Sequence, residues 1–194
     1  MFFRRLPKPW AVALDWVLSI AGAIVFVLVF EAEVAKPYRI PSASMEPTLH
    51  CARPETFCRA SISDRILVNR LAYRFRDPHR GEVVVFDAPA AAKSLCNHGG
   101  VYVKRIVGLP GELLSERQGF LFVVGRELAE PYVDPADRGI DTRTFPRVPA
   151  GEYFLMGDNR THSCDSRVWG AVPRKSLIGP VLLRYWPPNR IWFG

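Results

Sequence analysis

Two serines stand two residues apart between two prolines, in the stretch IPSASMEPTLH that covers residues 40–50. Pro41 and Pro47 bias the residues before them toward an extended backbone, so Ser42 and Ser44 lie in a short, stiffened segment. Such a segment can offer one hydroxyl as a nucleophile and hold a second hydroxyl and backbone N–H groups beside the oxyanion. Because Ser and Pro clusters are more often plain turns, this interpretation depends on partners elsewhere in the chain.

A lysine in an apolar strand is the second candidate. Lys104 lies within VYVKRIV, and strict alternation would place it on one face with Tyr102 and Ile106. Burial disfavours the charged form of an amine and lowers its pKa. An amine with a pKa of roughly 7–8 can serve as a general base. The alternative is an edge-strand lysine whose amine reaches solvent.

The third candidate is the segment GDNRTHSCDSRVWG, residues 157–170. Its first three residues predict a turn, and Ser163, Asp165 and Arg167 then alternate along the chain. A hydroxyl, a carboxylate and a guanidinium together can orient another polar side chain. The same string could equally form a structural loop.

These side chains must be positioned by the rest of the chain, which begins with an apolar run at residues 10–30. A helix of about 20 residues spans the roughly 30 Å hydrocarbon core of a bilayer. Asp15, the one charge within the run, lies near its basic end. The run is longer than the apolar part of a secretory signal and lacks a good cleavage site, since cleavage after Ala35 would put Glu33 at a small-residue position. We therefore expect an uncleaved membrane anchor.

Charge around this helix predicts its orientation. Basic residues precede it and none follows it directly, which places the N-terminus in the cytoplasm. We expect three parts: a basic cytoplasmic segment at 1–9, a transmembrane helix at 10–30, and an extracytoplasmic catalytic domain at 31–194. A net charge of +7 fits nucleic acid or an anionic membrane equally well. No nucleic-acid-binding motif is recognisable, so we expect a phospholipid bilayer as partner and no nucleic acid.

From Arg65 on, the sequence pattern is typical of a β protein. Short apolar, β-branched runs alternate with turn signals, and no convincing amphipathic helix follows the anchor. A hairpin is predicted to turn at Gly125-Arg126. The other predicted strands are 66–68, 83–86, 101–108, 153–156 and 181–186.

Together, the three candidate segments resemble the bacterial type I signal peptidases, the membrane-bound Ser/Lys proteases. Four boxes carry the resemblance in the family's order: IPSASMEPTL, SDRILVNR, YVKRIVGLPGE and GDNRTHSCDSRVWG. It extends from about Lys36 to the C-terminus. The resemblance implies a mostly β fold, an antiparallel β-rich catalytic domain of the Ser/Lys protease type preceded by one N-terminal transmembrane helix.

The resemblance also implies roles for individual residues. Ser44 would be the nucleophile and Lys104 its base, with Ser42 in the oxyanion hole. Ser163 would orient the Lys104 amine, with Asp165 and Arg167 in support. Residues matching the family's substrate pockets are Tyr38, Ile40, Met45, Leu49, Tyr102 and Val103.

The implied activity is endoproteolysis of exported preproteins, whose signal peptides would be removed after a small-x-small motif through an acyl-enzyme. No metal or organic cofactor is implied. We expect a monomer in the cell (cytoplasmic, inner) membrane with its catalytic domain outside. The motifs do not separate a bacterial plasma membrane from a thylakoid one.

The sequence departs from the family pattern in several places, among them Ser63, where glycine is common, and a short linker between Phe86 and Val101. Ala43 stands where glycine is common, which requires a negative φ there. The link between the first two boxes is longer than usual and contains Cys51 and Cys58. With Cys96 and Cys164 these permit three full disulfide connectivities, and Cys51–Cys58 is the local candidate. By residue type alone, the Cys164 thiol is also a candidate nucleophile.

Two rival functions remain open at this stage. One is a Ser-His-Asp hydrolase that uses His162 or another of His50, His79 and His98. The other is a membrane-anchored β module whose serines are structural. A related self-cleaving Ser/Lys regulator would need a DNA-binding domain where this chain has an apolar helix. Among the outer aromatic residues, we expect Trp192 and Phe193 to contact lipid, and Trp169 and Trp186 to be core.

Overall fold

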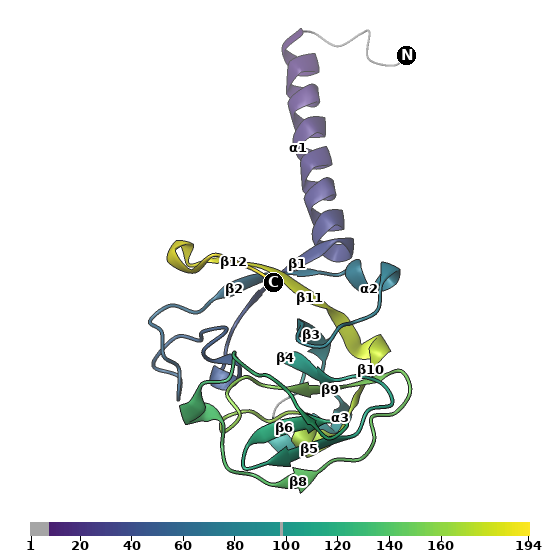
Figure 1. The fold of residues 1–194 in the computed structure, drawn as a ribbon. Coiled ribbons are helices and arrows are strands. Elements are labelled where there is room, and N and C mark those ends of the chain that lie inside the picture. The colour runs from purple at the N-terminus through teal and green to yellow at the C-terminus, as the bar shows by residue number, and fades with distance from the viewer. Residues whose placement is uncertain (1–7, 98) are drawn as a thin grey trace.

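The computed structural model describes residues 8–97 and 99–194. A single long helix, α1 (Lys8–Glu33), projects from a β-rich body (Figure 1). Its segment Val12–Glu31 is long and apolar enough to cross a membrane, with a mean hydropathy of 2.4 and none of it buried against the body. The helix thus contains the predicted range 10–30 and is longer at both ends, while the proposed cytoplasmic residues 1–7 lie outside the described part.

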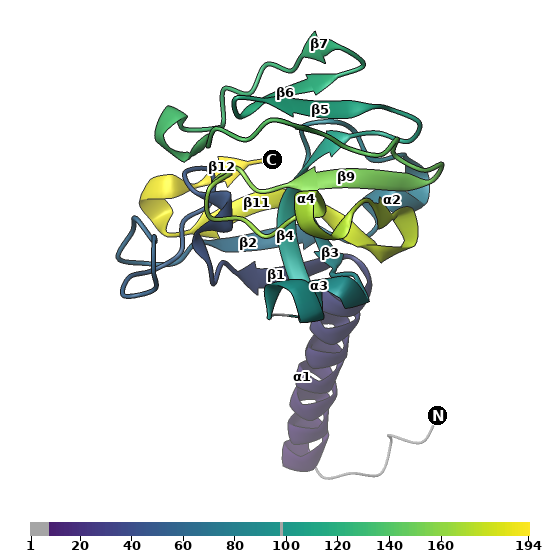
Figure 2. The same ribbon diagram turned by 90° about the horizontal axis from the view of Figure 1, so that it is seen from below.

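The larger sheet has eight strands in the order β1-β2-β11-β3-β4-β9-β10, with β12 paired to β11. Every pairing within it is antiparallel. Its strands are β1 (Ala35–Arg39), β2 (Arg65–Asn69), β3 (Val83–Asp87), β4 (Val101–Gly108), β9 (Glu152–Met156), β10 (Val172–Pro173), β11 (Leu177–Trp186) and β12 (Trp192–Phe193). β1, β2 and β11 lie nearest the foot of α1, whereas β9 lies deeper in the body (Figures 1 and 2).

A second, smaller sheet has the order β7-β6-β5-β8. Its strands are β5 (Leu114–Arg117), β6 (Phe120–Val123), β7 (Arg126–Glu127) and β8 (Arg143–Thr144). The predicted hairpin is present, but its two-residue turn is Val124-Gly125, one position earlier than predicted. Both turn residues have positive φ, 48° and 77°, which matches the right-handed twist of the flanking strands.

Short helical turns connect the strands. They are η1 (Ala43–Met45), α2 (Ala72–Phe75), α3 (Ala90–Cys96), η2 (Pro135–Asp137), α4 (Ser166–Trp169), η3 (Arg174–Ser176) and η4 (Pro188–Arg190). None is long enough to show helical periodicity, which is why no helix after the anchor was expected.

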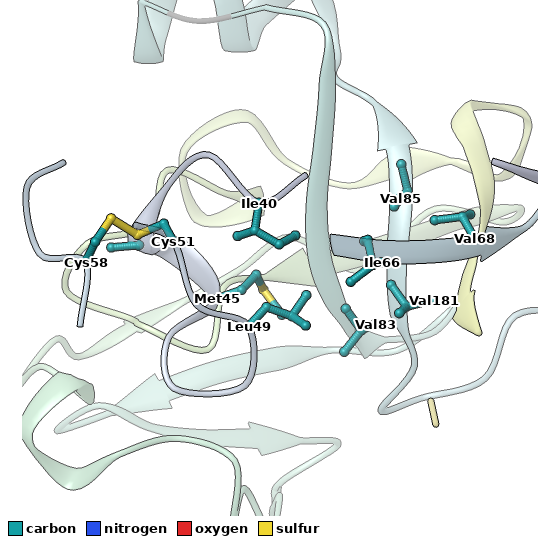
Figure 3. Close-up of a cluster of buried hydrophobic side chains, with 11 residues drawn as sticks. Ile40, Met45, Leu49, Cys51, Cys58, Ile66, Val68, Val83, Val85 and Val181 are labelled. Atoms are coloured by element: carbon teal, nitrogen blue, oxygen red, sulfur yellow. A yellow bond between two sulfur atoms is a disulfide. The ribbon is translucent and has the colours of Figure 1, made fainter. Parts of the chain in front are cut away.

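The larger sheet is covered by side chains on both faces. On β3, Val83 and Val85 belong to one buried cluster, and Val84 and Phe86 to another. This explains the unbroken run VVVF, since a strand buried on both sides has no solvent-facing alternation. The first cluster continues into the serine segment through Ile40, Met45 and Leu49 (Figure 3).

All four cysteines are paired. Cys51 joins Cys58, as predicted for the local candidate, and the pair borders the first cluster (Figure 3). Cys96 of α3 joins Cys164, which selects one of the three connectivities. With its sulfur in a disulfide, Cys164 is excluded as a nucleophile.

Candidate active site

The serine segment is anchored by apolar side chains on both sides of the nucleophile candidate. Ser44 is the middle residue of the single turn η1, whose φ values are negative, as Ala43 requires. Met45 and Leu49 are buried in the core, and the Leu49 N–H donates to the Met45 carbonyl over 2.8 Å. Glu46 is extended (φ −61°, ψ 141°), as Pro47 predicts. Burial therefore fixes the Ser44 backbone.

Lys104 reaches Ser44 from a central strand. β4 lies between β3 and β9, so Lys104 is not an edge-strand lysine and that alternative is wrong. Its side chain is fully buried, and its Nζ lies 2.5 Å from the Ser44 Oγ. Burial lowers the pKa of Lys104 to about 8, although Asp165 and Asp158 partly oppose the shift. A substantial fraction of the amine is thus neutral near pH 8.

Asp165 is the centre of the third segment. Its Oδ2 accepts hydrogen bonds from the Gly157 N–H over 3.0 Å and the Ser163 Oγ over 2.7 Å. Arg167 donates to Asp165 through Nε over 2.8 Å and Nη2 over 3.0 Å. Burial alone would raise the pKa of Asp165, but Arg167 and Lys104 hold that pKa below its usual value.

The hydrogen bond described for the Ser163 hydroxyl goes to Asp165, not to Lys104. A direct orienting contact from Ser163 to the lysine is therefore absent from this arrangement. Asp165 acts on Lys104 electrostatically, since its negative charge favours the ammonium form and raises the lysine pKa. Ser163 acts one step further away, by orienting that carboxylate.

Gly157 lets the third segment approach the nucleophile. A Cβ on this residue would lie 2.2 Å from the Ser163 Oγ and 2.4 Å from the Ser44 carbonyl oxygen, closer than real contacts allow. Two residues on, the Asn159 N–H donates to the same Ser44 carbonyl over 3.1 Å. Only glycine permits this packing of the two loops.

A second ion pair joins β4 to the third segment and was missed from the sequence. Arg105 donates to Asp158 through Nε over 2.9 Å and Nη2 over 2.7 Å. Thr48, at the end of the serine segment, donates to Asp158 over 2.5 Å. The signal was the pair Lys104-Arg105 in an apolar strand, because each face of β4 then carries one buried charge that needs partners.

A groove opens above these residues. It encloses about 500 Å³ and includes Ser42 and Ser44 in its walls. The Ser42 Oγ lies 3.5 Å from the Ser44 Oγ. The remaining lining residues are Tyr38, Arg39, Ile40, Pro41, Met45, Glu55, Gly99, Val101, Tyr102 and Val103.

Five of the six residues expected in substrate pockets line this groove. Leu49 is not among them: it is completely buried in the cluster beneath the serine segment. Leu49 anchors the segment from below. Arg39 and Glu55, which do line the groove, have no counterpart among the expected residues.

The histidines that the structure describes have other partners. His162 bonds Asn159 and Thr161 and packs its ring on Phe57. His50 contacts Glu46, and His79 contacts Arg76 and Glu82. None of these bonds involves Ser44, and His98 lies outside the described residues.

Ser44 is paired with a buried lysine and lines a groove, and the β-rich domain carries one long apolar helix. This is the arrangement of a membrane-anchored serine protease. The chain matches the family described as "Signal peptidase, peptidase S26" over residues 13–186. It therefore belongs to that family of serine endopeptidases and has the signal peptidase class of activity.

Several named proteins are similar to it. It is 39% identical to "Probable signal peptidase I-2" of Synechocystis sp., over 89% of this chain and 73% of that one. It is 34% identical to "Signal peptidase I" of Leptolyngbya laminosa, over 95% and 85%. A solved signal peptidase I from Enterococcus faecalis is 32% identical, with a TM-score of 0.46, over 54% of this chain and 97% of that one.

Proposed function

We propose that Ser44 and Lys104 form the catalytic dyad that removes signal peptides from exported preproteins. Neutral Lys104 accepts the Ser44 proton as Oγ bonds to the scissile carbonyl carbon. The Ser42 hydroxyl and the Ser44 N–H stabilise the oxyanion. The peptide C–N bond then breaks, and the leaving amine takes the proton from Lys104. Water next attacks the acyl carbon and gives a proton to Lys104. The bond between that carbon and the Ser44 Oγ then breaks, and Lys104 returns the proton to Ser44.

The observation that carries this proposal is the 2.5 Å approach of the buried Lys104 Nζ to the Ser44 Oγ at the groove floor. The groove walls near the serine are aliphatic, with Ile40, Met45 and Val103. Such walls offer no partner to a charged side chain, which supports cleavage after a small, uncharged residue.

The test is cleavage of a model preprotein by the detergent-solubilised full chain. We expect a single cut after the small-x-small motif, identified from product masses, and no cut by Ser44→Ala. An uncut substrate, or cuts unrelated to that motif, would contradict the proposal. Activity of the Ser44→Ala variant would favour the alternative of a histidine-dependent hydrolase.

Ser42 offers a prediction of its own. Ser42→Ala should fold normally and lower kcat by roughly 10²–10³, the usual loss for one oxyanion donor. Ser42→Thr keeps the hydroxyl and should recover part of the rate. A wild-type kcat in Ser42→Ala would mean that backbone donors suffice.

We also propose that the domain acts as a monomer at the bilayer surface, with the N-terminus in the cytoplasm. An apolar groove at the foot of α1 supports the membrane contact; it is lined by Phe26, Val27, Phe30, Glu31, Ala35, Pro37, Leu67, Leu183 and Tyr185. Nearby aromatic side chains differ from expectation. Trp186 is 41% exposed rather than core, and Trp192 packs partly against the core, while Phe193 is 73% exposed.

These exposures predict which tryptophan meets lipid. In vesicles of brominated lipid, a full-length variant that retains only Trp186 should be strongly quenched, because aromatic rings favour the headgroup region. A variant that retains only Trp169, which packs against a buried cluster, is the matched control and should be quenched little. Equal quenching of the two would contradict the proposed contact between the bilayer and the surface that carries Trp186.

A further inference from the structure

The loop closed by Cys51 and Cys58 brings one acidic side chain to the groove. Glu55 lies in this loop and lines the same groove as Ser44. Its side chain is exposed, and no hydrogen bond or ion pair to it is found among residues 8–97 and 99–194. By contrast, Asp134 and Asp137, which hold the same loop from outside, are both paired with Arg59.

The backbone that carries Glu55 is held in place. The Glu55 N–H donates to the Ala52 carbonyl over 3.3 Å, and the Glu55 carbonyl accepts from the Cys58 N–H over 3.2 Å. The Cys51–Cys58 disulfide closes the loop around these two bonds. The backbone therefore holds Glu55 at the groove, while its exposed side chain can turn toward a ligand.

The base of the loop is fixed as well. Glu46 is buried, and its Oε1 accepts from the Cys51 N–H over 3.3 Å and the Arg59 N–H over 3.2 Å. Arg59 then donates to Asp134 over 2.8 Å and Asp137 over 2.6 Å. Phe57 packs on His162 with ring centroids 3.5 Å apart. The loop is thus tied to the serine segment and to two neighbouring loops.

We propose that Glu55 is a specificity-determining residue, whose carboxylate favours preproteins with a lysine or arginine close to the scissile bond. Within the described lining, Arg39 is the other charged residue, and it belongs to β1 whereas Glu55 belongs to the disulfide loop. The other lining residues are uncharged. A basic substrate side chain beside the disulfide loop would therefore meet one opposite charge that has no partner among the described residues and is carried by an ordered backbone. This inference rests on the proposed function, because it assumes that the groove binds the substrate chain.

The expected effect is modest because the carboxylate is exposed. Exposed ion pairs change equilibrium constants by roughly 1.5- to 5-fold and are screened by salt. We therefore expect a preference in kcat/KM of roughly 2- to 5-fold for lysine over glutamine at one substrate position. That preference should shrink toward none near 1 M salt, where the screening length falls to about 3 Å.

The test uses the full chain in detergent and one cleavable peptide, with Lys, Gln or Glu placed in turn at each position around the bond other than the two small ones. Wild type should favour Lys over Gln at one position, Glu55→Gln should abolish that preference, and Glu55→Lys should reverse it in favour of Glu. Glu127→Gln, which neutralises an exposed carboxylate on β7 outside the groove lining, should keep it. Arg39→Gln distinguishes the effect of Glu55 from the effect of the net charge of the groove. It should leave the Lys preference at that position in place.

Two results would overturn the inference. One is the absence of any position at which wild type prefers Lys, and the other is a preference that survives in both Glu55→Gln and Glu55→Lys. Each of these two results counts against the inference only if the enzyme cleaves the peptide that carries Gln. Failure of wild type to cleave every peptide would instead count against the proposed function, so the two failures are distinguishable.

Discussion

Replacing Ser44 by Ala, replacing Lys104 by Met, and making both changes together should each reduce kcat by about the same factor. We expect a loss on the order of 10⁴–10⁶, because residues that act as one unit in a reaction are strongly non-additive. The geometry behind this is the 2.5 Å contact between Lys104 Nζ and Ser44 Oγ. Lys104→Arg should be equally inactive, since a guanidinium stays charged and cannot accept the proton.

Lys104→Met is preferred to Lys104→Ala because the side chain is fully buried and Met keeps most of its volume. Its melting temperature should stay near that of wild type, which separates lost chemistry from lost folding. Lys175→Met, on the exposed turn η3, is the matched control and should keep full activity. Losses that multiply in the double variant would show that the two residues act independently.

Gly157→Ala should also slow the enzyme, by roughly 10²-fold, although Gly157 takes no part in the chemistry. The added Cβ would lie 2.4 Å from the Ser44 carbonyl oxygen, whereas ordinary contact begins at 3.4 Å. The two segments must therefore move apart by about 1 Å to relieve the clash. A misplacement of about 1 Å can cost roughly 10²-fold in rate. Overpacking should add roughly 1–3 kcal/mol of destabilisation.

The control for this prediction is Gly99→Ala. Its new Cβ would meet the Lys93 side chain no closer than 3.6 Å, which is ordinary contact, so the melting temperature should not change. Gly157→Ala should melt several degrees lower, at about 2–4 °C per kcal/mol for a chain of this size. A Gly157→Ala enzyme with wild-type kcat would mean that the two loops do not need this close packing.

The anchor and the longer strands could be predicted because their signals are local, whereas the roles of the candidate site residues came from the family resemblance. The run VYVKRIV is apolar on both faces, which indicates a covered strand, but the sequence alone left open whether Lys104 is buried or reaches solvent from an edge. The central position of β4 in the sheet decides for burial. The anchor follows from length and hydropathy. Strand β1 was not predicted, because AKPYR has no apolar alternation and forms a strand only by pairing with β2.

Other features depend on long-range packing that one sequence does not encode locally. The family resemblance placed Leu49 in a substrate pocket, whereas its side chain packs in the buried cluster. The partner of Arg105 is Asp158, 53 residues away, and nothing near either residue specifies the pair. The Ser163 hydroxyl donates to Asp165, and this choice of partner follows from the tertiary arrangement.

The measurement that tests the account most directly is the dependence of kcat/KM on pH for a short peptide substrate. The base must be neutral to accept the Ser44 proton, so its protonated form is inactive. Burial lowers the pKa of Lys104 to about 8. We therefore expect kcat/KM to fall about tenfold per pH unit below that pKa and to level off above it. A flat profile, or a single ionisation at the usual pKa of histidine, roughly 6.5, would contradict a Ser44–Lys104 dyad.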